Sequence, residues 1–115
     1  MGDSAREPVV GRMRLDEAVW TVKVEWEDHN GTMSRGDYIS LLLGQLMEAV
    51  QHAERGELLR YSREMADIVS IAYQALMAEG LDPEPFVVAR VLEKILPALK
   101  DGSVEAKYRL QRRIP

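Results

Sequence analysis

Three glycines divide the chain into segments of helical length. Gly31 follows an asparagine in a turn, and Gly56 and Gly80 suit the left-handed conformation that often follows the last residue of a helix. The spacing predicts helices over residues 14–28, 35–55 and 57–79. Because the second and third helices are joined by a very short turn, we expect them to form an antiparallel hairpin.

Helix-start signals complete the expected fold. Ser34, with Asp37 three residues later, predicts a cap and a helix start near Arg35, and Pro83 opens a helix over 83–95. That helix carries an apolar stripe expected to be buried, made of Phe86, Val87, Val88, Val91, Leu92 and Ile95. We expect an all-α bundle of four to five helices around the hairpin. It divides into a flexible leader (1–11), the helical domain (12–102) and a basic C-terminal helix or tail (103–115).

Composition narrows the class of protein. A chain of 115 residues supports one compact domain. The absence of cysteine excludes a disulfide scaffold, a thiolate zinc site and a cysteine nucleophile, and favours the cytoplasm. The longest apolar stretch, residues 68–78, is too short to span a bilayer. The net charge of -4 argues against nucleic acid as a partner, so we expect neither a membrane nor a nucleic-acid partner.

Polar side chains form one stripe on each helix of the expected hairpin. In an antiparallel pair turning near residue 56, Glu48 lies level with Glu64, and Gln45 lies level with Asp67. If the stripes face each other, three carboxylates and an amide oxygen converge, and like charges that close need a proton or a cation between them. Mg²⁺ prefers such oxygen ligands. The alternative is that both stripes face water.

Three segments together resemble a known family. They are Leu43-Gly44-Gln45-Leu46-Met47-Glu48-Ala49, Arg63-Glu64-Met65-Ala66-Asp67-Ile68-Val69 and Ala78-Glu79-Gly80-Leu81-Asp82. Over roughly residues 35–96 the chain resembles the MazG-like, all-α nucleoside triphosphate pyrophosphohydrolases. The resemblance implies a MazG-like helical bundle, Mg²⁺ bound by acidic residues, and cleavage between the α- and β-phosphates. It also implies assembly of the chains as dimers or tetramers.

The family motifs match this chain in part. Glu64 and Asp67 match the Glu-x-x-Asp motif, whereas the two glutamates of the first motif fall on Leu42 and Gln45. Glu48, one turn further along the same face, is a candidate substitute. Lys94, in Leu92-Glu93-Lys94-Ile95, resembles a residue that meets a phosphate of the substrate.

Two functions follow as hypotheses. The first is a pyrophosphohydrolase using Mg²⁺, or Mn²⁺ as a substitute, with metal ligands Glu48, Glu64, Asp67 and Gln45 and substrate contact Lys94. The second is a catalytically degenerate nucleotide-binding or protein-interaction module. In both cases we expect a homo-oligomer, first of all a dimer, because the apolar face over 65–77 is strong enough to be completed by another subunit.

Overall fold

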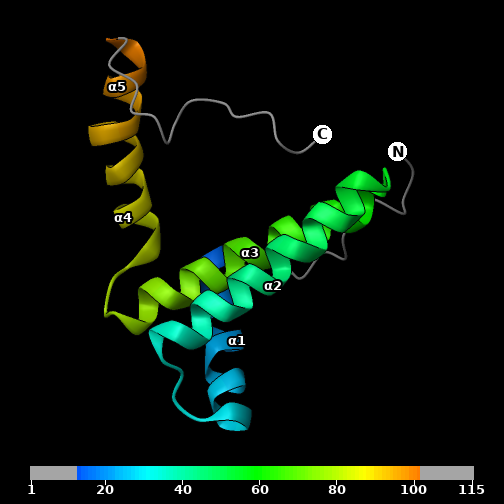
Figure 1. Cartoon of the computed structure of the whole chain (residues 1–115). Coiled ribbons are helices and arrows are strands. Elements are labelled where there is room, and N and C mark those ends of the chain that lie inside the picture. The colour runs from blue at the N-terminus through cyan, green and yellow to red at the C-terminus, as the bar shows by residue number, and fades with distance from the viewer. Residues whose placement is uncertain (1–12, 102–115) are drawn as a thin grey trace.

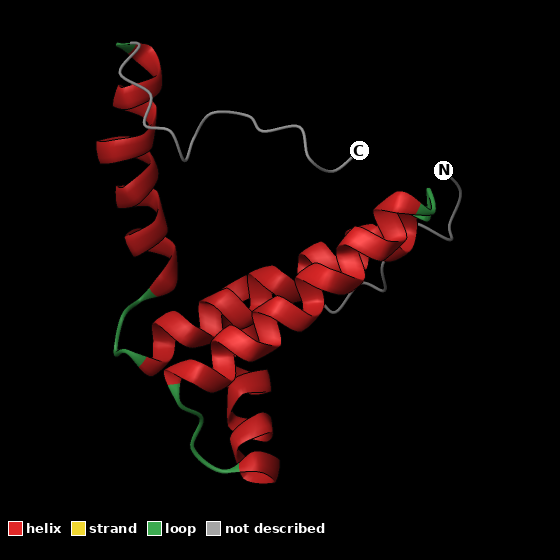
Figure 2. Cartoon of the chain, viewed as in Figure 1, coloured by secondary structure: helices red, strands yellow, loops and turns green. Residues whose placement is uncertain are grey.

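The computed structural model describes residues 13–101, and every regular element in this range is helical (Figure 2). The elements are α1 (Leu15–Asn30), α2 (Arg35–Glu54), α3 (Leu58–Ala78), α4 (Pro83–Arg90), the π-helical turn η2 (Val91–Ile95) and α5 (Leu96–Lys100). The predicted all-α class is therefore confirmed. The leader (1–11) and the predicted helix over 103–114 lie outside the described residues.

The hairpin of α2 and α3 is the centre of the molecule, with the two helices side by side (Figure 1). Gly56 adopts a positive φ of 70° and donates its N–H to Ala53 O at 3.1 Å, while Glu57 N donates to His52 O at 2.9 Å. This pair of bonds is a Schellman motif, which satisfies carbonyls at the end of α2 and reverses the chain. The predicted turn is confirmed.

The predicted start of α2 is also confirmed. Asp37 N donates to Ser34 Oγ at 3.1 Å, and Ser34 N donates to the Asp37 carboxylate at 2.8 Å, so the two residues cap each other. α1 runs two residues further than predicted, because Asn30 stays helical with its side-chain amide donating to Trp26 O and only Gly31 turns the chain.

α1 packs against the hairpin and supplies part of a small core. The buried apolar residues of the described range are Val19, Tyr38, Ala49 and Ile71. Lys23 of α1 is also buried. Its ammonium group lies 3.0 Å from a Glu27 carboxylate oxygen and over the Trp20 ring, which offsets the cost of removing the charge from water.

α4, η2 and α5 form one continuous rod, residues 83–100, here called the arm, which projects away from the hairpin (Figure 1). The predicted burial of its apolar stripe is wrong for the single chain. Phe86 is 48% exposed and Leu92 is 56% exposed, and Val87, Val88 and Val91 are exposed as well, while Ile95 is half-buried. The stripe is uncovered because the rod leaves the bundle, with only Pro83 of the arm fully buried.

The arm is also longer than the helix predicted over 83–95. It passes through Pro97 and reaches Lys100. Proline has no N–H to donate to the backbone carbonyl one turn earlier, and its ring clashes with that carbonyl. The wider π-helical turn just before Pro97 leaves room for the ring and does not require the missing hydrogen bond. Within residues 13–101, no helix is both long and apolar enough to cross a membrane.

Candidate functional site

Glu48 of α2 and Glu64 of α3 meet across the hairpin. A hydrogen bond between the two carboxyl groups is the largest cause of a raised pKa at Glu64, followed by removal from water and then by the negative charges of Glu48 and Asp67. The side chain of Glu64 is 12% exposed. The two residues therefore lie at one level of the hairpin, as the turn position predicted, with Glu48 exposed to water and Glu64 half-buried.

His52, one turn after Glu48, lies between Glu64 of this pair and a further carboxylate, Glu57. Its Nδ1 lies 2.8 Å from Glu57 Oε1, and its Nε2 lies 3.8 Å from Glu64 Oε2. The hydrogen bond with His52 lowers the pKa of Glu57, so Glu57 is an acceptor and Nδ1 carries the proton. This arrangement directs Nε2 of His52 toward Glu64.

Glu57 was not among the predicted site residues. It follows His52 by five positions, with the Gly56 turn between them. Within one continuous helix that spacing would place the two side chains on different faces, whereas the Schellman turn brings Glu57 back over the end of α2. The signal in the sequence is an acid directly after the helix-ending glycine.

The other predicted site residues are placed differently. Asp67 is exposed and acts on Glu64 through its charge. Gln45 is half-buried, and its Oε1 is a buried acceptor without a hydrogen-bond partner in the described part of the chain. Lys94 belongs to η2 in the arm, which extends away from the hairpin that carries the acids (Figure 1). The structure brings Glu48 and Glu64 together, and it does not bring Lys94 to them.

The donor set decides what kind of metal site these residues fit. Across residues 13–101, no group of three or more acidic, histidine or cysteine side chains lies close enough to hold a metal ion. The described side chains therefore form no closed metal cage of their own. Mg²⁺ often takes one or two carboxylates and completes its shell with water and substrate phosphates, so Glu48 and Glu64 offer part of such a ligand set.

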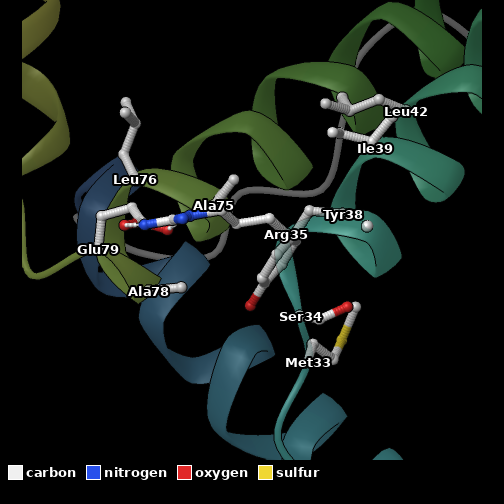
Figure 3. Close-up of a pocket in the computed structure, with 11 residues that line it drawn as sticks. Met33, Ser34, Arg35, Tyr38, Ile39, Leu42, Ala75, Leu76, Ala78 and Glu79 are labelled. Atoms are coloured by element: carbon white, nitrogen blue, oxygen red, sulfur yellow. Dashed lines mark hydrogen bonds and ion pairs between the residues drawn. The ribbon is translucent and has the colours of Figure 1, made fainter.

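An apolar cavity of about 850 Å³ lies at the open end of the hairpin, opposite the Gly56 turn (Figure 3). Tyr38, Leu42 and Leu76 are among the residues that line it. At its rim Arg35 makes a two-pronged ion pair with Glu79, at 2.7 and 2.8 Å, which lowers the pKa of Glu79. The position where the resembling enzymes carry a glutamate is thus occupied by a lining residue of this cavity, Leu42.

No family model, curated protein or solved structure matches this chain. The resemblance to the MazG-like enzymes is therefore a prediction carried by the quoted motifs alone.

Proposed function

We propose that the chain is a Mg²⁺-dependent nucleoside triphosphate pyrophosphohydrolase, converting a nucleoside triphosphate and water to a nucleoside monophosphate and pyrophosphate. The observation that carries the proposal is the carboxyl pair of Glu48 and Glu64. At neutral pH two carboxylates held that close repel each other unless they retain a proton or share a cation. A divalent cation resolves the repulsion without a rise in pKa.

Each residue has a distinct role in this proposal. Glu48 and Glu64 would hold the metal, Gln45 would offer its unpartnered amide oxygen, and the exposed Asp67 would add negative charge at the solvent side. The hydrogen bond from His52 to Glu57 would keep the imidazole pointed at Glu64. Mg²⁺ would supply charge neutralisation of the phosphates and a lower barrier to attack on phosphorus. Mn²⁺ has the same ligand preference and would substitute.

The cavity supports the nucleotide part of the proposal. Leu42 lines the cavity and Glu48 lies six residues further along α2, about 9 Å at the rise of an α-helix. Neither Glu48 nor Glu64 lines this recess, but an apolar recess on the same hairpin as two carboxyl groups would suit a molecule with a flat, apolar end and a charged end, as a nucleoside triphosphate has.

A second function is favoured by a specific observation. Leu42 and Gln45 replace two acids of the first motif, and no three-acid group is formed among the described side chains. A chain that retained the bundle and lost catalysis would act as a nucleotide-binding or protein-interaction module.

A pyrophosphate-release screen distinguishes the two functions. The full chain is assayed with common ribo- and deoxyribonucleoside triphosphates in Mg²⁺ or Mn²⁺, beside Glu64→Gln and Asp67→Asn. Glu25→Gln removes an exposed acid on α1 and serves as the control. We expect release by the wild type and by the control, and loss of at least tenfold in Glu64→Gln. No release by the wild type across the panel would contradict the enzyme, and nucleotide binding without release would favour the module.

A further inference from the structure

We propose that His52 and Glu64 bind one divalent transition-metal ion, such as Co²⁺ or Zn²⁺, in preference to Mg²⁺, and that Nε2 of His52 is the ligand that makes the choice. The inference deepens the proposed function, on which it rests for what the metal does to a phosphate. The binding site itself follows from the positions of the side chains, and it is tested without nucleotide.

Two electron-rich atoms face each other across the end of the hairpin. Nδ1 of His52 carries the ring proton and donates it to Glu57 Oε1 at 2.8 Å, so Nε2 presents a lone pair. The atom opposite this lone pair is Glu64 Oε2, at 3.8 Å, which is too far for a direct hydrogen bond. A ring nitrogen and a carboxyl oxygen that face each other across such a gap both attract a cation.

The gap between the two atoms has the width of a metal site. Ligand atoms lie about 2.1 Å from a Zn²⁺ ion, so two of them are roughly 3.4 Å apart at a tetrahedral angle and roughly 4.2 Å apart on opposite sides of the ion. The separation of 3.8 Å between Nε2 and Oε2 falls within this range. An ion therefore fits between the two side chains in the positions that they already occupy.

Glu57 fixes the imidazole in this orientation. Its Oε1 accepts the Nδ1 proton of His52, and its Oε2 lies 3.6 Å from the guanidinium group of Arg60. A metal-bound histidine almost always gives its other ring N–H to a carboxylate, a backbone carbonyl or water, which sets the tautomer and makes the free nitrogen a better ligand. Glu57 is thus a positioning residue that acts on the metal through His52.

The donor atoms decide which ion is preferred. Mg²⁺ takes oxygen ligands, whereas an imidazole nitrogen suits Zn²⁺ and the other later transition metals. The carboxyl group of Glu48, which interacts with Glu64, is a further oxygen donor beside the pair. Because the described side chains form no closed group of three ligands, water or a phosphate oxygen would complete the shell. The side chains of His52 and Glu64 are 19% and 12% exposed, so the ion would be partly shielded from solvent.

The first test measures metal affinity by isothermal titration calorimetry at pH 7.5, on the full chain without a histidine tag. We expect the wild type to bind Co²⁺ about tenfold or more tightly than Mg²⁺. His52→Ala should lose about tenfold or more of the Co²⁺ affinity and leave the Mg²⁺ affinity nearly unchanged. His29→Ala removes the other histidine of the chain, on the exposed face of α1, and should match the wild type. Equal affinities for the two ions in the wild type, or an equal loss of both in His52→Ala, would overturn the proposal.

The variant for the positioning residue is Glu57→Gln. It keeps an acceptor for Nδ1 of His52 but removes the negative charge, so the Co²⁺ affinity should fall about tenfold. Glu54→Gln changes an exposed acid three positions earlier and is the control, which should bind Co²⁺ as the wild type does. An unchanged affinity in Glu57→Gln would overturn the role given to Glu57.

The second test observes the ligand atom directly and needs no variant. Long-range ¹H–¹⁵N NMR spectra distinguish the two ring nitrogens of each histidine, and Zn²⁺ is added to the wild-type chain. We expect Nε2 of His52 to shift while the ring nitrogens of His29 stay in place. A spectrum in which Nε2 of His52 does not move would overturn the proposal.

Binding and turnover separate this inference from the proposed function. Co²⁺ binding that depends on His52, in a chain that releases no pyrophosphate, would support the inference and contradict the enzyme. Pyrophosphate release with Mg²⁺, without any metal binding that depends on His52, would support the enzyme and overturn the inference.

Discussion

Glu64 of α3 interacts with the carboxyl group of Glu48 on α2, and this interaction is the main reason why the pKa of Glu64 is raised above its ordinary value of 4.5. Two acids on separate helices are thus held closer than their charges favour. The hairpin turn imposes that proximity, because α2 and α3 pack along their whole length and place the two side chains at one level.

The first prediction concerns stability against pH. A raised pKa means that the folded chain holds the proton of Glu64 more tightly than the unfolded chain does. The contribution of this residue to stability is therefore fully present below pH 4.5 and is lost as the pH rises through the raised pKa. Glu64→Gln removes the titration, so urea unfolding between pH 4 and 8 should give a flatter profile than the wild type.

The control for this profile is Glu25→Gln, on the exposed face of α1. It should reproduce the wild-type slope. Parallel profiles for the wild type and Glu64→Gln would show that the carboxyl pair does not titrate as described.

The second prediction concerns added metal. If Mg²⁺ binds the carboxyl pair, ten times its Kd adds about 1.4 kcal/mol to the free energy of unfolding, which raises the Tm by roughly 5 °C or more in a domain of this size. Differential scanning fluorimetry at pH 7.5 should show this rise for the wild type and for Glu25→Gln. Glu64→Gln should show less than half of it, and an equal shift in all three proteins would mean that the ion acts elsewhere.

The third prediction compares two glycines. Gly56 has a positive φ of 70°, which an alanine tolerates poorly, so Gly56→Ala should lower the free energy of unfolding by about 1–2 kcal/mol. Gly44 lies within α2, and nothing lies within 4 Å of the position that an added Cβ would take. Gly44→Ala should therefore raise the free energy of unfolding by about 0.5–1 kcal/mol. Denaturant unfolding measures both, and changes of the same sign would refute the assignment of the turn.

The fourth prediction concerns the cap of α2. Ser34→Ala removes the side-chain oxygen that accepts from Asp37 N, and should cost about 1 kcal/mol of stability. Ser40→Ala, on an exposed helical position of α2, is the matched control and should change stability little or raise it slightly. Thermal unfolding at constant protein concentration compares the two, and equal losses would argue against the cap.

Local signals in the sequence were sufficient for the elements of the hairpin. Ser34 starts a helix, and Gly56 and Gly80 end helices, through hydrogen bonds between residues at most five positions apart. The residues next to each helix end are therefore enough to determine where the helix starts or stops. The position of the turn alone predicted that Glu48 and Glu64 lie opposite each other along the hairpin. Glu57 was missed because its contact with His52 depends on the shape of the turn, which a helical projection does not represent.

The direction of a helix as a whole required the tertiary structure. The pattern of Phe86, Val88 and Leu92 predicted an apolar face correctly, but it could not say which surface covers that face. The exit angle at Gly80 and Pro83 sends the arm away from the bundle and separates Lys94 from the acids.

The sequence by itself therefore determined where the helices lie, how the hairpin turns and which acids share a level, because these depend on short-range hydrogen bonds and on helical period. Only the tertiary structure decided that Glu48 and Glu64 meet while Asp67 stays in water, and that the apolar arm is left uncovered. Those outcomes depend on how helices are rotated and angled against one another, which is set by packing among residues far apart in the chain.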